Sequence, residues 1–228
     1  MSVSTPVKSH YQTVIRNGLF FDGSGASPTQ SDIAINDGVV AARGDLSTVT
    51  ADHVVDAQGR WVMPGLLDIH THLDLEVELD PALSEVVRHG TTTVVVGNCS
   101  LGAAFGHQRS TGQDPIVDCF ARVENLPKSL LSRCGDAMHW SDTAGYLNHF
   151  ENIALGPNIA PLIPHSMLRI EAMGLEAAIS RAPTEVEMQR MVELLRQAME
   201  QGYAGFSTDS LPFHYLANNP NTEKKIPT

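Results

Sequence analysis

Short apolar runs alternate with turn-forming residues over the first 62 residues. The runs occupy residues 13–16, 19–22, 32–35, 39–41, 53–56 and 60–63. The dipeptides between neighbouring runs are Asn17-Gly18, Asp37-Gly38 and Gln58-Gly59. Asn-Gly and Asp-Gly between apolar runs are the strongest short-range hairpin signals. The spacing therefore predicts a small antiparallel β unit over residues 11–62, with a hairpin at Asn17-Gly18.

After Pro64-Gly65, apolar runs alternate with helical patterns. The runs that predict strands are residues 66–70, 91–96, 158–163 and 203–207. The helical patterns occupy residues 81–89, 114–123, 143–150 and 184–201. Strands that alternate with helices predict βα units around a parallel sheet. The β-branched run at 91–96 has no polar alternation, which predicts a strand buried on both faces.

The helix predicted at residues 184–201 has the clearest boundaries. Thr184 and Glu187 have the spacing of a capping box, and Gly202 follows the last periodic residue. We expect one buried apolar face on this helix. Its apolar residues are Val186, Met188, Met191, Val192, Leu194, Leu195 and Met199.

Composition and charge narrow the class of protein. The 228 residues are 42% hydrophobic, far more than in a disordered chain. A net charge of −11 argues against nucleic acid and anionic membranes as partners. No run reaches the ~18 apolar residues of a membrane span. Three cysteines and an N-terminus without a signal-peptide pattern lead us to expect a cytoplasmic protein.

His70 and His72 follow the first apolar run after Pro64-Gly65. Residues i and i+2 of a strand point to the same side, so the two imidazoles are expected to converge at the strand's carboxyl end. Imidazole nitrogens are common metal ligands, and (β/α)8 barrels keep their active sites at this end. An isolated His-x-His pair is more often a chance pair on a strand edge, so the surrounding sequence decides.

The surrounding residues, from Pro64 to His72, read Pro-Gly-Leu-Leu-Asp-Ile-His-Thr-His. This run resembles the opening motif of the amidohydrolase superfamily, in which a small β-sandwich leads into a metal-dependent barrel. The preceding β segment also resembles that family's sandwich strands. The resemblance implies an α/β fold: an incomplete (β/α)8 barrel of about four βα units over residues 63–228, preceded by part of a small β-sandwich over residues 1–62.

Gly97-Asn98-Cys99 ends the second predicted strand of the barrel. By itself, a cysteine there is most often a buried apolar filler. Within the superfamily, however, it resembles the N-acyl-D-amino acid deacylase (D-aminoacylase) branch, where the cysteine thiolate replaces a carboxylated lysine of strand four as metal ligand. The fourth predicted strand of this chain has no lysine. The resemblance therefore implies one or two Zn²⁺ ions held by His70, His72 and Cys99.

Three further residues are weaker candidates for substrate binding or for support of the ligands: Asp68, His165 and Asp209. Asp68 shares the strand face of His70, and either orients a ligand histidine or caps a loop. His165 ends the third strand, beside the pocket or in ordinary packing. Asp209 stands where many deacylases carry glycine in a Ser-Thr-Gly-Leu run, so it bears on substrate preference.

The resemblance covers roughly residues 12–215, and includes segments around Glu124 and Trp140. It implies hydrolysis of a linear amide, from an N-acyl-D-amino acid to a carboxylate and a D-amino acid, with that small molecule as partner. In this branch, two histidines of strands five and six complete the site, and an aspartate of strand eight is the general base. We expect those residues beyond residue 228, and therefore no activity from this chain alone.

Two alternatives remain open. One is a cyclic-amide hydrolase of the dihydropyrimidinase or dihydroorotase type, which Cys99 and the lysine-free fourth strand disfavour. The other is a non-catalytic fragment that is completed by another chain.

Overall fold

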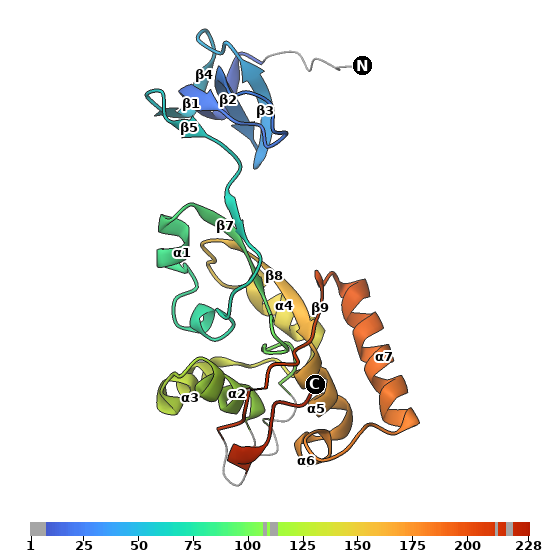
Figure 1. Cartoon of the computed structure of the whole chain (residues 1–228). Coiled ribbons are helices and arrows are strands. Elements are labelled where there is room, and N and C mark those ends of the chain that lie inside the picture. Colours follow the sequence, from blue (N-terminus) through green and yellow to red (C-terminus); the bar gives the residue numbers. More distant parts are fainter. Residues whose placement is uncertain (1–7, 107–108, 110–113, 213, 218–220) are drawn as a thin grey trace. The chain divides into compact units, whose positions relative to one another are not determined.

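The computed structural model describes residues 8–106, 109, 114–212, 214–217 and 221–228. The chain divides into two units, residues 1–65 and residues 66–228 (Figure 1). Each unit has its own buried core: Tyr11, Val14 and Leu46 belong to the core of the first, and Phe120 and Ile163 to that of the second.

The first unit is a five-stranded sheet in which β3, β2, β1 and β4 are neighbours in that order and β5 also pairs with β1. Its strands are β1 (His10–Phe20), β2 (Thr29–Asn36), β3 (Val39–Gly44), β4 (Thr50–Asp56) and β5 (Trp61–Val62). The β1–β2 and β2–β3 pairs are antiparallel, but β4 and β5 run parallel to β1. The expectation of an all-antiparallel unit is therefore wrong for β4 and β5.

The hairpin predicted at Asn17-Gly18 is also wrong, because β1 runs straight through it. Asn17 has a positive φ of 57°, and the register against β2 shifts between Ile15 and Gly18, which is a β-bulge. The Asn17 backbone N–H donates to Asp32 and its side-chain amide donates to Asp56, both at 2.9 Å. These two contacts hold Asn17 inside the sheet, so its turn-forming tendency produces a bulge.

The second predicted turn forms as expected. Asp37 and Gly38 join β2 to β3 with φ values of 50° and 74°. Two successive positive φ values characterise the type I′ turn, whose twist suits an antiparallel hairpin. The hairpin at Asp37-Gly38 is confirmed.

The second unit contains a parallel sheet with the order β6-β7-β8-β9. Its strands are β6 (Leu66–Asp68), β7 (Thr91–Val96), β8 (Asn158–Pro164) and β9 (Gly205–Ser207). Helical segments connect the strands, so neighbours in sequence are neighbours in the sheet (Figure 1). This arrangement confirms the predicted α/β fold, an incomplete barrel of four parallel strands.

The described helical segments of this unit are η1 (Glu76–Glu78), α1 (Ser84–Arg88), α2 (Pro115–Val123), α3 (Lys128–Ala137), α4 (Thr143–Glu151), α5 (His165–Met173), α6 (Leu175–Ala178), α7 (Glu185–Gln201) and η3 (Asn221–Glu223). The four predicted helices are present, whereas α3, α5 and α6 were not predicted. On α3 only Leu131, Cys134 and Gly135 are buried, so the sequence has too few periodic apolar positions to predict this helix. None of the helices in these described ranges could span a bilayer.

Helix α7 begins and ends where the sequence predicts. Thr184 and Glu187 form the capping box, and Gly202 follows the helix with φ 108°. The single buried face is narrower than expected, because only Met191, Leu194 and Ala198 are buried. The apolar side chains that remain exposed are Val186, Met188, Val192 and Met199.

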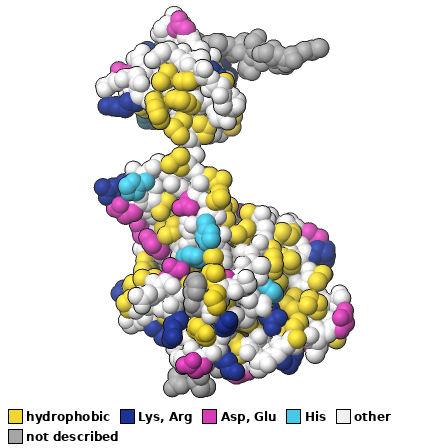
Figure 2. All heavy atoms as spheres, in the orientation of Figure 1, with side chains coloured by type: hydrophobic (Ala, Val, Ile, Leu, Met, Phe, Trp, Pro, Cys, Tyr) yellow, Lys and Arg dark blue, Asp and Glu magenta, His cyan; other side chains and the backbone are white. Residues whose placement is uncertain are grey.

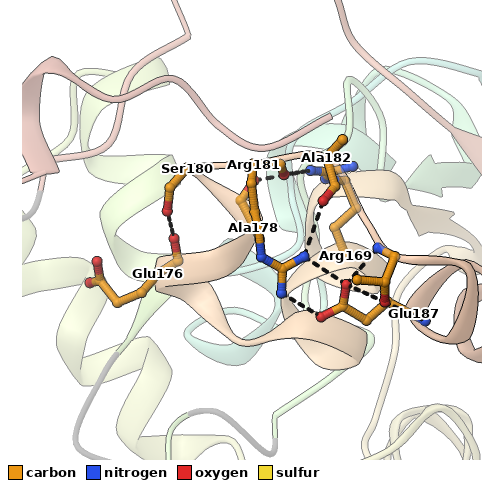
Figure 3. A network of polar contacts seen from close by, with 8 residues as sticks. Arg169, Glu176, Ala178, Ser180, Arg181, Ala182 and Glu187 are labelled. Carbon is orange, nitrogen blue, oxygen red and sulfur yellow. Dashed lines mark hydrogen bonds and ion pairs between the residues drawn. The ribbon is translucent and has the colours of Figure 1, made fainter.

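A polar network holds the connection from α5 through α6 to the start of α7 (Figure 3). Arg181 donates to both carboxylate oxygens of Glu187 at 2.7 Å, and this contact lowers the pKa of Glu187 from 4.5 to about 2. Arg169 of α5 donates to the backbone carbonyls of Ala178 and Arg181, at 3.1 and 3.2 Å. The Arg169 guanidinium therefore fixes the main chain of this connection.

The strands of the second unit are less buried than predicted. On β7 only Val94 and Val96 are fully buried, so the expectation of burial on both faces is wrong. On the outer strands of the described sheet, Leu66 and Phe206 are 50% and 43% exposed. Apolar side chains accordingly reach the surface of this unit in Figure 2. A four-stranded sheet has open edges, unlike a closed barrel, which explains this exposure.

Candidate metal centre

Two histidines and a cysteine meet at the carboxyl ends of β6 and β7. His70 and His72 follow β6, and Cys99 follows β7. One potential ligand atom from each residue lies within 4.8 Å of the other two. The Nε2 of His70 is 3.1 Å from the Sγ of Cys99, and the two imidazole rings are 5.5 Å apart. The structure thus brings together the three residues that the sequence predicts as ligands.

The backbone after β7 takes an unusual course that presents Cys99. Gly97, Cys99 and Ser100 have positive φ values of 80°, 51° and 66°. A β-carbon at Gly97 would lie 2.5 Å from the carbonyl oxygen of Leu162, so only glycine fits there. Positive φ at non-glycine residues is uncommon and gathers at functional sites.

Side chains and backbone groups of three strands anchor this loop. The amide of Asn98 donates to the carbonyls of Val95, at 2.8 Å, and Thr71, at 3.4 Å. The Ser100 N–H donates to the hydroxyl of Ser207 on β9, at 3.1 Å. These bonds tie the Cys99 loop to the chain after β6 and to the ends of β7 and β9, so the backbone that carries Cys99 is held in place before any ion binds.

The environment of His72 favours a neutral ring. Burial lowers its pKa, and the nearby Glu124 carboxylate acts in the opposite direction. The Nε2 of His72 is 3.9 Å from Glu124 Oε1, whereas its Nδ1 is buried without a hydrogen-bond partner among the described residues. A neutral imidazole is the form that binds metal, and a buried nitrogen without a partner is suited to a ligand.

Burial raises the pKa of the Cys99 thiol, and the carboxylates of Asp209 and Glu124 raise it further. The thiol is therefore protonated when no cation is nearby. A divalent cation reverses this electrostatic preference and deprotonates a coordinating thiol. Two imidazole nitrogens and one thiolate are donors that Zn²⁺ accepts, so the residues present fit zinc.

Asp68 and His165 are not members of the donor cluster and make other contacts. Asp68 is exposed and accepts a hydrogen bond from the backbone N–H of His70, at 3.2 Å, so it holds the main chain at His70. His165 begins α5, and its Nδ1 is 3.0 Å from the hydroxyl of Thr208. Burial, and then the charge of Arg169, lower the pKa of His165.

Asp209 forms a buried ion pair with His214, in which both side chains are 5% exposed. Asp209 also accepts a hydrogen bond from the Leu211 N–H at 2.8 Å. The pair is within electrostatic reach of the donors, because Asp209 raises the pKa of Cys99 and His214 lowers that of His72. A buried carboxylate and a buried imidazole therefore adjoin the donors.

The sequence did not single out His214, and it included Glu124 only within a resembling segment. Neither residue has a spacing to His70 or Cys99 that indicates a shared site. Glu124 directly follows α2, and His214 lies beyond β9. Only the fold brings them to the donors, so no local signal could have identified them.

Several curated proteins, two of them named as deacylating enzymes, resemble most of this chain. An uncharacterised protein of Mycobacterium tuberculosis is 44% identical over 202 residues, which are 86% of this chain and 32% of that protein. N-acyl-D-glutamate deacylase of Alcaligenes xylosoxydans xylosoxydans is 35% identical over 195 residues, 86% of this chain and 36% of the relative. D-aminoacylase of the same organism is 30% identical over 216 residues, 95% and 41% of the two chains. The chain thus spans 32% to 41% of the length of these curated relatives.

Solved structures of deacylating enzymes also resemble this chain. N-acyl-D-glutamate deacylase from Bordetella bronchiseptica, complexed with zinc and a phosphonate inhibitor, matches with a TM-score of 0.70 and 31% identity over 87% of this chain and 38% of that one. A crystal structure of D-aminoacylase matches with a TM-score of 0.69 and 28% identity, over the same shares. The model of the amidohydrolase family matches residues 53–226, and the chain therefore belongs to that family.

Proposed function

We propose that this protein hydrolyses the linear amide bond of an N-acyl-D-amino acid with the help of zinc. Water adds to the carbonyl carbon, the C–N bond breaks, and the amine nitrogen gains a proton. The products are a carboxylate and a D-amino acid. Two relatives named for deacylation of acidic D-amino acids, N-acyl-D-glutamate deacylase and N-acyl-D-aspartate deacylase, support this substrate class.

The convergence of His70, His72 and Cys99 is the observation that carries this proposal. Their donor atoms lie within 4.8 Å of one another, from loops that follow two adjacent parallel strands. This is the end of the barrel at which enzymes of this architecture carry out chemistry. A related deacylase binds zinc in its crystal structure, which supports the choice of metal.

Each residue near the donors has a proposed task. His70, His72 and Cys99 hold the ion, and bound zinc supplies polarisation of an amide carbonyl and activation of water. Glu124 orients the imidazole of His72 by drawing its Nε2 side toward the carboxylate. The buried Asp209–His214 pair provides fixed polar groups beside the donors, which favours one placement of a polar substrate.

Hydrolysis and zinc content, measured together on the full-length protein, test the proposal. We expect release of a D-amino acid from an N-acyl-D-amino acid that stops when a chelator removes the metal. Cys99→Ala should lose zinc and hydrolysis together. Cys119→Ala is the matched control, because Cys119 is a buried thiol of α2 outside the donor cluster. Hydrolysis that survives both the chelator and Cys99→Ala would refute the proposal.

A further inference from the structure

An apolar cavity of about 210 Å³ opens beside the metal donors. It lies between η1 and the neighbouring helices α2 and α3, which Figure 1 shows side by side. We call it the leucine cavity. Its lining residues are His72, Leu75, Glu76, Leu79, Phe120, Leu126, Leu130, Leu131 and Cys134.

The leucine cavity has a buried floor and an exposed apolar mouth. Phe120 and Leu131 belong to the floor and are 1% and 2% exposed. Leu79, Leu126 and Leu130 form the mouth and are 48%, 42% and 37% exposed. Apolar side chains that face solvent around a cavity gain free energy when an apolar ligand covers them. In another protein, an apolar cavity of about 150 Å³ binds benzene, so this volume suffices for a hydrocarbon group.

One wall of the cavity is His72, which is also a member of the metal donor cluster. A ligand with its apolar end in the cavity therefore has its other end next to the proposed zinc ion. An acyl chain attached to an amide carbonyl has this shape, with a hydrocarbon tail at one end and the reacting carbon at the other.

We propose that the leucine cavity binds the acyl chain of the substrate and so selects medium-length acyl groups. This inference rests on the proposed function and adds the acyl group to it. Among the described residues, the lining contains no lysine or arginine and includes the carboxylate of Glu76. The amino acid half of the substrate carries an α-carboxylate, which such a wall repels, whereas the acyl half is uncharged.

The names of the relatives also favour the acyl half of the substrate as the occupant of the leucine cavity. Two of them are named for different amino acids, D-glutamate and D-aspartate, and both names share the N-acyl group. The side chains of those amino acids are anionic, so a cavity of this lining does not suit them. The acyl arm is therefore the occupant that the lining favours.

The two products of hydrolysis provide unreactive probes for a test. Calorimetry on the zinc-loaded full-length protein measures the dissociation constants of straight-chain carboxylates from acetate to decanoate. We expect the affinity to rise about fourfold per added methylene. The rise should level off at about six or seven carbons, because a cavity of 210 Å³ holds about seven groups of water size.

Leu130→Trp places a bulky ring at the mouth and should abolish this chain-length dependence. Val192→Trp is the matched control, because Val192 is an exposed apolar residue of α7 far outside the lining. Leu126→Ser, a smaller change at the exposed mouth, should reduce the dependence and replaces Leu130→Trp if that variant does not fold. D-amino acids from D-alanine to D-norleucine should show no dependence on side-chain length.

Three results would overturn the inference: no dependence on carboxylate length, including no binding at all; a dependence that Leu130→Trp leaves intact; or a dependence on amino acid side-chain length that Leu130→Trp removes. The last result would assign the cavity to the amino acid side chain. A protein that shows the expected dependence but hydrolyses no N-acyl-D-amino acid would refute the proposed function alone. Hydrolysis without a dependence of affinity on carboxylate length would refute only the assignment of the cavity to the acyl chain.

Discussion

The imidazole Nε2 of His70 lies 3.1 Å from the thiol sulfur of Cys99, although the two residues are 29 positions apart in the chain. Each residue follows a strand of the same parallel sheet, and the loop of Cys99 is bonded to the chain after β6 and to the end of β9. The contact therefore results from the order of β6 and β7 in the sheet. A nitrogen and a sulfur held this close form a pair of donors that a single ion can bridge.

Zinc binding should release a proton and strengthen with pH. Burial raises the pKa of Cys99, so the thiol carries its proton in the metal-free protein, and the thiolate forms only with the ion. We expect the zinc affinity to rise about tenfold per pH unit below the thiol pKa. Calorimetry in buffers of different ionisation enthalpy measures the released proton. Binding without proton release would show that Cys99 is not a ligand.

Replacement of Glu124 should weaken zinc binding without removing a ligand. Its carboxylate is 3.9 Å from His72 Nε2, and partners of ligand histidines typically contribute a factor of about 10 to 100 in metal affinity. Glu124→Gln should therefore lower the affinity in a chelator competition by that factor. Glu151→Gln, at the end of α4, is the control and should leave it unchanged. Equal zinc affinities for the unmodified protein, Glu124→Gln and Glu151→Gln would rule out a contribution of Glu124 to metal binding.

Gly97→Ala should destabilise the second unit more than Gly202→Ala does. Both glycines have positive φ, 80° and 108°, so each substitution strains the backbone by about 1 kcal/mol. At Gly97 the new β-carbon also meets the Leu162 carbonyl oxygen at 2.5 Å, whereas nothing lies within 4 Å at Gly202. We expect an additional loss of about 1–3 kcal/mol from this crowding. Urea unfolding measures both, and equal losses would contradict the geometry of the Cys99 loop.

The Arg181–Glu187 contact should make stability depend on pH in the acidic range. The pKa of Glu187 falls to about 2 in the folded chain from 4.5, so its contribution is fully present above pH 4.5. It is lost as the pH falls through about 2, because the carboxylate then takes up a proton. The difference in unfolding midpoint between the protein and Glu187→Gln should shrink over this range. Glu185→Gln, in the same first turn of α7, is the control. A difference that is constant with pH would contradict the assignment.

The parts of the fold that the sequence predicts are those with a strong local pattern. Thr184, Glu187 and Gly202 mark the ends of α7 correctly, because capping depends on residues that are near one another in the chain. The Asn17-Gly18 hairpin is wrong because Asp32 and Asp56, which are distant in sequence, hold Asn17 within β1. Tertiary contacts of this kind override the local tendency of Asn-Gly to form a turn.

In the candidate metal site, too, local sequence patterns predict some residues, and only the fold brings the others together. His70 and His72 are two residues apart in the chain directly after β6, which is shorter than the predicted strand, and a family motif indicates their role. The sequence therefore predicts that both lie at one strand end, although strand geometry does not set their orientation. Glu124 and His214 reach the donors through α2 and through the chain after β9. The leucine cavity likewise depends on the packing of α3, a helix with too few buried positions to predict.

X-ray absorption at the zinc edge tests the central claim most directly, because it identifies the atoms that bind the ion. With His70, His72 and Cys99 as ligands, the spectrum of the zinc-loaded full-length protein should contain one sulfur at about 2.3 Å and nitrogens at about 2.0–2.1 Å. The sulfur contribution should vanish in Cys99→Ala and persist in Cys119→Ala. A spectrum of the unmodified protein with only nitrogen and oxygen neighbours would contradict the proposed metal centre.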